Sequence, residues 1–321
     1  MTTTAPVAKL RTVLIAFVAN VLVAVAKSFA AVLTGSASIL AEAAHSWADA
    51  GNEIFLVIAE RKSAKTPDAA HPLGYGRESY VWSLFAAVGL FTAGAVVSVQ
   101  HGISELLDPE PASDFAIAYV VLAVAAVLEG VSFTQSVVQA RAGAKRFRRG
   151  TFDYALNGSN ATLRAVLAED AAALVGLTFA FLGVLLHQLT GDAVYDAVGS
   201  LLIGALLGVV AIILINRNRR YLVGVIPADS VRASVGTSLL EHPEIQRVTY
   251  LHLEFVGPAQ LFLVAAVDLI GDRREDDVAI QLRTLERAIE ENELVQTAVL
   301  TLSVHDEPSL EFYRATAAPP R

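Results

Sequence analysis

Long apolar runs occupy most of the first two thirds of the sequence. Six of them, residues 10–34, 37–60, 78–106, 113–140, 161–187 and 195–216, approach or exceed the ~20 residues that a helix needs to cross the hydrocarbon core of a bilayer. Of the 321 residues, 54% are hydrophobic and only 17% are charged, and the mean hydropathy is +0.52. This composition is too apolar for an ordinary soluble domain. The sequence predicts an α-helical polytopic membrane protein with six transmembrane helices.

Positive charges in the connections predict the orientation of these spans. Connections on one side carry Lys9, Arg11, Arg61, Lys62, Lys65, Arg77, Arg141, Lys145, Arg146, Arg148, Arg149, Arg217, Arg219 and Arg220. The opposite connections, TGSAS, LDPEPASD and HQLTGDA, contain no Lys or Arg. Because cytoplasmic loops are enriched in positive charge, we expect both termini in the cytoplasm, and we expect the chain to reside in the cell membrane. Residues 1–222 form the predicted six-helix transport domain.

A soluble domain is predicted after this membrane region, over residues 223–311. VRASVGTSLLEHPE and DDVAIQLRTLERAIEEN have helical periodicity, whereas RVTYLHLEF, QLFLVAAVDL and TAVLTLSVH alternate as strands do. The order αββαβ suits a small α+β domain with two helices on one face of a three-stranded sheet. We expect residues 312–321 to be a disordered tail.

Ionisable residues within the second apolar run indicate a site, because charged groups inside a bilayer are costly and need a functional partner. Glu42, His45, Asp49 and Asn52 are spaced three, four and three residues apart, so they share one face of a helix. Histidine four residues before aspartate can present two ligands to one divalent ion. With no cysteine in the chain, thiolate ligands and cysteine nucleophiles are excluded. A satisfied packing histidine is the alternative reading.

The fifth apolar run supplies the predicted partner of this stripe in the sequence RAVLAED. Glu169 and Asp170 are adjacent, so they point about 100° apart on a helix and cannot face one point equally well. We expect His45, Asp49 and Asp170 to bind a metal ion, with the fourth ligand from Glu169, Asn52 or water. The alternative is that the acidic pair only complements the dipole at a helix terminus.

These motifs together resemble the cation diffusion facilitator family, whose members exchange divalent metal ions for protons. The resemblance rests on Asn20, Lys27, TGSASILAEAAHSWAD and TPDAAHPLGYGRESY. LEG around Glu129, LAED around Asp170 and YDAVGSL around Asp196 are most similar to the divergent branch that includes zinc transporter nine. The resemblance implies metal ligation by His45, Asp49 and Asp170, and a ferredoxin-like, metallochaperone-like fold for the αββαβ domain.

One position departs from the family pattern and leaves the choice of metal open. Where the family has a His or Asp four residues before the fifth-span aspartate, this chain has Val166, so Glu169 or Asn52 would have to complete the ligand shell. Carboxylate and amide oxygens suit harder ions. Zn²⁺ is the expected substrate, with Mn²⁺ or Fe²⁺ as the alternative.

Further polar residues are candidates for secondary roles. Asp68 and His71 in PDAAHPLGYGR, and His252 with His305 in the soluble domain, are candidate secondary metal ligands. The loop equally fits a tight turn, and the two histidines equally fit surface or core positions. Lys27 and Glu129 are expected to form an intramembrane ion pair or to belong to a proton path.

The ligand chemistry predicts a divalent metal cation/proton antiporter that exports Zn²⁺ from the cytoplasm by alternating access, with no cofactor. Metal binds deprotonated ligands, so protonation releases it, and His45 is the expected proton-sensitive ligand. A membrane metalloenzyme and a non-transporting metal sensor are the rival readings, although no HExxH motif is present. Expected partners are the metal ion, protons, the lipid bilayer and a second copy of the chain, without nucleic acid. The homodimer would pair through a sheet face bearing Tyr250, His252 and Glu254.

Overall fold

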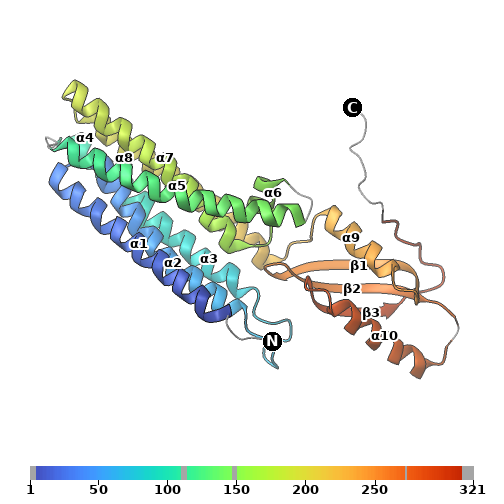
Figure 1. The fold of residues 1–321 in the computed structure, drawn as a ribbon. Helices are drawn as coiled ribbons and strands as arrows, with labels where there is room; N and C mark the ends of the chain where they lie inside the picture. The colour runs from blue at the N-terminus through green and yellow to red at the C-terminus, as the bar shows by residue number, and fades with distance from the viewer. Residues whose placement is uncertain (1–4, 110–113, 147–149, 272, 313–321) are drawn as a thin grey trace. The chain divides into compact units, whose positions relative to one another are not determined.

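The structure is a computed structural model that describes residues 5–109, 114–146, 150–271 and 273–312; for residues 5–16, Ala19, Phe91 and Arg146 it describes the backbone alone. The chain divides into two compact units (Figure 1). One unit contains the residues up to Arg61 together with Ser79–Arg219, and the other contains Lys62–Glu78 together with the residues from Arg220 onward. The connection between the second and third apolar runs therefore belongs to the second unit.

Long helices that run side by side make up the first unit (Figure 1). They are α1 (Ala5–Thr34), α2 (Ala37–Ser63), α3 (Glu78–Gly89), the π-helix η1 (Leu90–Val96), α4 (Val97–Leu107), α5 (Phe115–Arg146), the short α6 (Thr151–Asn157), α7 (Ala161–Thr190) and α8 (Val194–Val223). The elements α3, η1 and α4 follow one another without a break and form one continuous rod.

Four of these rods are long and apolar enough to cross a membrane: Glu78–Leu107, Phe115–Lys145, Ala161–Thr190 and Val194–Val223. Of α1, the described apolar part Asn20–Thr34 is shorter, and α2 carries Glu42, Asp49 and Glu53 within its length. The chain is thus a multi-pass membrane protein, and the count of six spans stays a prediction.

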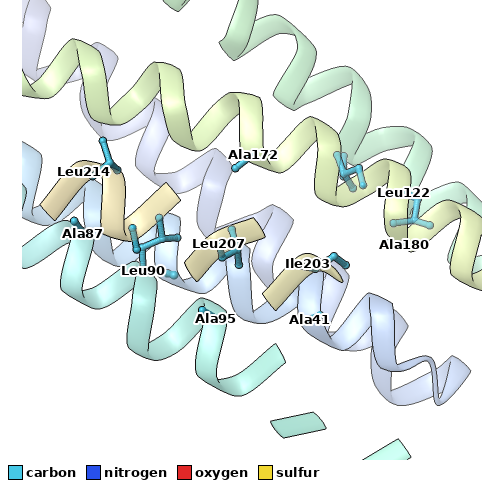
Figure 2. Close-up of a cluster of buried hydrophobic side chains, with 14 residues drawn as sticks. Ala41, Ala87, Leu90, Ala95, Leu122, Ala172, Ala180, Ile203, Leu207 and Leu214 are labelled. Atoms are coloured by element: carbon cyan, nitrogen blue, oxygen red, sulfur yellow. The ribbon is translucent and has the colours of Figure 1, made fainter. Parts of the chain in front are cut away.

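Small side chains bring the helices of the first unit close together around an apolar core. Figure 2 shows this core, in which α2 contributes Ala41, α7 contributes Ala172 and α8 contributes Leu207. Glycines act in the same way between α4 and α8, where a Cβ added at Gly204 would lie 2.7 Å from Val99 Cγ2. Small residues at helix contacts are typical of membrane bundles, in which close backbone approach favours association.

The π-helix η1 interrupts the third rod where it passes α2. A Cβ added at Gly89, the residue before η1, would lie 3.3 Å from Asn52 Oδ1. Within η1, the hydroxyl of Thr92 donates to the carbonyls of Val88 and Gly89 at 3.0 and 3.2 Å. The single Thr92 hydroxyl is therefore shared between two carbonyls at the point where the regular α-helical pattern changes. Such π segments frequently lie beside functional sites.

The second unit contains a small sheet with helices on one face. Its elements are α9 (Asp229–Leu240), β1 (Ile245–Gly257), β2 (Gln260–Leu269), α10 (Glu275–Glu290) and β3 (Val295–Leu302), in the sheet order β1-β2-β3. β1 and β2 are antiparallel, and β2 and β3 are parallel. Leu239 of α9, Leu285 of α10 and Leu251 of β1 share one buried cluster, so both helices pack on the same sheet face.

Residues after β3 continue along the edge of this sheet. The strand ends at Leu302, earlier than the predicted strand, which reached His305. The Arg247 guanidinium binds the carbonyls of Val304, His305 and Glu307, and the Leu310 amide donates to Val248 O. Phe312 packs against Gly236 of α9, so the first residue of the predicted disordered tail is packed. The rest of that tail, residues 313–321, lies outside the described residues.

Candidate metal site

Four polar residues of α2 lie along one side of the helix within the apolar bundle. Glu42, His45 and Asn52 are at most 1% exposed, and the side chain of Asp49 is 18% exposed. His45 Nε2 lies 3.2 Å from Asp49 Oδ2, as expected for residues one helical turn apart. The predicted His45 and Asp49 pair is therefore preformed, and its more accessible member is the carboxylate.

The two acidic residues of α7 contact different helices. Glu169 Oε1 accepts a hydrogen bond from Asn52 Nδ2 over 3.1 Å, which connects α7 to α2. Asp170 instead accepts hydrogen bonds from Ser132 and Ser136 of α5 at 3.0 to 3.1 Å. Sequence reasoning did not identify these serines, although their spacing of four residues places them on one face of α5.

Electrostatic interactions join these groups into one charged region. The charge of Asp49 acts on Glu169, on Asp170 and on Glu129 of α5, and His45 acts on Glu169 and Glu129. Among the described residues, however, no three His, Asp or Glu side chains already converge as a metal shell. The predicted set of His45, Asp49 and Asp170 is thus assembled from neighbouring helices but is not closed around one point.

Lys27 has a different partner from the one predicted. Its Nζ lies 2.9 Å from Glu42 Oε2, and both side chains are at most 1% exposed. Lys27 therefore forms an ion pair with Glu42 of α2, and not with Glu129 as predicted. The two residues lie on consecutive helices, α1 and α2, and a buried charge that lacked such a partner would be strongly unfavourable.

Several buried polar atoms of this region have no hydrogen-bond partner among the described residues. They are Nδ1 of His45, Oδ1 of Asp49 and Oε1 of Glu42. Buried polar atoms are nearly always satisfied, and an exception needs an explanation such as a bound ion. Imidazole nitrogen and carboxylate oxygen are ligands of divalent cations, so the atoms at His45 and Asp49 fit a cation as substrate.

The secondary candidates lie in the second unit and are less enclosed. His71 Nδ1 is 3.5 Å from Asp68 Oδ1, with both side chains 51% exposed. The Tyr75 hydroxyl donates to Asp68 Oδ2 over 2.7 Å and holds the pKa of that carboxyl below its ordinary value. Asp68 also accepts from the backbone amides of Ala70 and His71, so the carboxylate already stabilises the turn.

The two candidate histidines of the soluble domain occupy different environments. His252 Nε2 lies 3.9 Å from Glu254 Oε2 on the same strand, whereas His305 belongs to the segment whose carbonyls bind Arg247. No cluster of three ligating side chains joins them within the described residues. Glu254 is paired with Arg77, a contact that the sequence pattern did not reveal.

Ionisable side chains buried in a bundle of apolar helices are typical of membrane proteins that move ions. Residues 13–223 match the cation efflux transmembrane domain, and the chain belongs to that family. This confirms the resemblance to the cation diffusion facilitators. The chain is 37% identical to the mitochondrial proton-coupled zinc antiporter SLC30A9 of Xenopus laevis over 247 residues, which are 76% of this chain and 44% of that protein.

Two further relatives agree with this assignment. Identity is 34% to the human mitochondrial proton-coupled zinc antiporter SLC30A9, over 81% of this chain and 46% of that protein. It is also 34% to metal tolerance protein C4 of Arabidopsis thaliana, over 73% of this chain and 51% of that protein. The chain thus spans about half the length of these curated relatives.

Proposed function

We propose that this chain exchanges a divalent metal cation, Zn²⁺ in the first instance, for protons across a membrane. The observation that carries the proposal is the preformed His45 and Asp49 pair, buried in the bundle with unpartnered ligand atoms. Glu169 and Asp170 on α7 lie within electrostatic range of Asp49. Two relatives are named as proton-coupled zinc antiporters, which supports the same proposal.

The exchange follows from competition between metal and protons for the same atoms. A cation binds neutral imidazole and ionised carboxylate, so binding at His45 and Asp49 releases protons, and proton uptake releases the cation. If the site opens to one face of the membrane at a time, inward proton flow drives the metal outward. Closure around the ion would bring the α7 carboxylates to the α2 pair, since they are not yet convergent.

The ligand set also bears on which metal is carried. His45 is the one imidazole among the proposed ligands, and the remaining groups are the carboxylates of Asp49, Glu169 and Asp170 with the amide of Asn52. Zinc accepts such mixed nitrogen and oxygen ligands, but oxygen-rich shells also accommodate Mn²⁺ or Fe²⁺. Efflux of one of these ions by the same mechanism is the second candidate.

The remaining features of the transporter are proposed on sequence grounds. Six spans with both termini in the cytoplasm follow from the distribution of Lys and Arg. The domain boundaries 1–222 and 223–311, residence in the cell membrane, and assembly into a homodimer belong to the same proposal. Secondary metal binding at Asp68 and His71, or at His252 and His305, is a subordinate part of it.

Transport by the purified chain in liposomes tests the proposal. Zn²⁺ gradients should drive proton movement, read by a metal-sensitive dye inside the vesicles and a pH-sensitive dye outside them. Asp49→Asn should abolish this flux because the variant loses an anionic ligand. Asp192→Asn, at an exposed position after α7, is the matched control and should transport like the unaltered chain. Normal flux in Asp49→Asn would contradict the proposed binding of the transported metal by His45 and Asp49.

A further inference from the structure

Polar residues continue along α2 beyond the metal site, toward the end of the bundle where α1 joins α2 and α7 joins α8. Ser38, Glu42, His45 and Asp49 are spaced four, three and four residues apart, so they share one helix face. Ser38 and Glu42 are both 0% exposed. Successive members are separated by about 4.5 to 6 Å along the helix axis.

Asp196 lies at the outer end of this row. It belongs to the first turn of α8 and is 1% exposed. Its Oδ1 accepts from Ser36 Oγ at 3.0 Å, from the Ser38 amide at 3.4 Å, and from Ser38 Oγ. Its Oδ2 is buried without a partner among the described residues, so one carboxylate oxygen holds the start of α2 and the other is unused.

Glycines bring three helices together at this point. A Cβ added at Gly183 of α7 would lie 2.9 Å from Ser38 Oγ and 3.3 Å from Asp196 Cα. One added at Gly199 of α8 would lie 3.1 Å from Ser38 Oγ. The next buried polar group on the Gly183 face of α7 is His187, one turn onward. The contact between Ser38 and Asp196 is therefore enclosed by α2, α7 and α8.

Glu42 occupies the middle of the row and also has an unused oxygen. Oε2 is bound by Lys27 of α1, whereas Oε1 has no partner among the described residues and lies against Gly176 of α7. The charged groups around Glu42 are Lys27 from α1 and His45 from its own helix. From α7, the residue that faces Glu42 is Gly176, which carries no charge. Ser38 thus contacts Asp196 and lies one helical turn before Glu42 on α2.

We propose that Asp196, Ser38 and Glu42 form a proton path that connects the α7–α8 end of the bundle with the metal site. This inference rests on the proposed antiport. A proton from the aqueous phase binds Asp196, moves past the Ser38 hydroxyl to Glu42, and then passes to the site. Each carboxylate is anionic again after donating, and bridging water can span the gap between neighbours. Once the proton has moved on, the adjacent Lys27 ammonium stabilises the Glu42 carboxylate.

Two transport assays can distinguish loss of the proton path from loss of metal binding. Exchange of labelled for unlabelled Zn²⁺, at equal concentration and pH across the vesicle, needs metal binding but no net proton movement. Net Zn²⁺ transport driven by a pH gradient needs both. Glu42→Gln keeps the shape of the side chain and a hydrogen-bond acceptor for Lys27, but it cannot carry a proton as a carboxylate does.

We expect Glu42→Gln to retain exchange within about 2-fold while losing about 100-fold in proton-driven transport, the scale of a positioned proton-transfer group. Asp196→Asn should show the same split. Asp192→Asn is the matched control, because Asp192 is an exposed carboxylate at the same α7–α8 end of the bundle; it should keep both modes. If Glu42→Gln does not fold, Asp196→Asn decides by the same two measurements.

Three results would count against these claims in distinguishable ways. Unchanged proton-driven transport in the variants would overturn the proton path. Equal loss of exchange and of proton-driven transport would also overturn it, because the residues would then serve metal binding or folding. Absence of both modes in the unaltered chain would instead overturn the proposed antiport.

Discussion

Glu169 and Asp170 are neighbours in sequence, but their side chains serve different contacts. The family pattern identifies Asp170 as the ligand from this helix. In the structure the carboxylate nearest to α2 by hydrogen bonding is Glu169, which Asn52 holds. Asp170 is held by Ser132 and Ser136. A helical offset of about 100° between adjacent residues accounts for this separation.

We expect Glu169→Gln to weaken Zn²⁺ binding more than Asp170→Asn does, because Glu169 already faces the helix that carries His45 and Asp49. Titration calorimetry of the purified variants gives the two affinities directly. The opposite ranking would restore Asp170 as the leading ligand of α7.

The amide that holds Glu169 has a testable role of its own. Asn52→Ala should reduce metal affinity by about 10- to 100-fold, the range for groups that orient a ligand. Asn20→Ala provides the control, since it removes an amide bonded to Glu53 at a position outside the proposed site. Equal losses in both variants would show a general effect on folding and not the positioning of Glu169.

Spacing in the sequence predicts which residues share a helix face, and it therefore identified Glu42, His45, Asp49 and Asn52 together. It does not determine the rotation of one helix against another. For this reason the partner of Lys27, the two serines bound to Asp170 and the contact between Asn52 and Glu169 became visible only in the folded bundle.

At the scale of the elements, the close contact between α4 and α8 depends on glycine. A Cβ at Gly204 would lie 2.7 Å from Val99 Cγ2 and 3.0 Å from both Ala95 O and Val99 N. Two of these three atoms belong to the backbone and cannot rotate away. The contact must therefore open before a larger residue fits.

Gly204→Ala should lower the stability of the folded chain by about 1 to 3 kcal/mol through overpacking. Thermal unfolding in detergent measures the change. Gly130→Ala on α5 is the control, because an added Cβ there meets nothing within 4 Å and alanine favours helix over glycine. A loss in Gly130→Ala as large as in Gly204→Ala would contradict the steric explanation.

The length of the apolar runs predicts where the long helices lie, but it does not predict local irregularities within or between them. The π-helix η1 and the short α6 have no distinct hydrophobic signature. The early end of β3 reflects competition from Arg247, whose guanidinium binds the carbonyls of the residues that follow. These features depend on tertiary contacts, which a one-dimensional pattern does not contain.

At the scale of the whole molecule, the segment Lys62–Glu78 behaves as part of the soluble unit. Arg77 pairs with Glu254 of β1, and a Cβ at Gly76 would lie 2.5 Å from Val256 O and 2.6 Å from Gly257 Cα. The sequence predicts dimer contact through the sheet face that bears Tyr250, His252 and Glu254, and on this face Arg77 of the same chain already binds Glu254.

Gly76→Ala should detach this segment from the turn between β1 and β2, because the facing backbone cannot move aside. Trypsin should then cleave faster after Lys62 or Lys65, as seen by mass spectrometry of the full chain. Gly150→Ala tests for an unspecific effect, since its Cβ would meet only Asp153 Cβ at 3.9 Å. Unchanged cleavage in Gly76→Ala would contradict the packing of the segment.

The proposed homodimer can be tested with the same preparations. Removal of residues 223–321 should weaken dimer formation and slow transport without abolishing it, since the proposed transport ligands on α2 and α7 lie outside the removed segment. Light scattering of the detergent-purified proteins gives their masses. A full-length chain that is monomeric at micromolar concentration and still transports would exclude the dimer as the working unit.

The serine contacts of Asp170 carry a mechanical consequence. Its two oxygens offer about four acceptor positions, and the hydroxyls of Ser132 and Ser136 make three contacts with them. A cation that binds both oxygens would compete with these two hydroxyls for the same carboxylate. Binding of the metal ion would therefore weaken the contact between α5 and α7, and release of the ion would restore that contact.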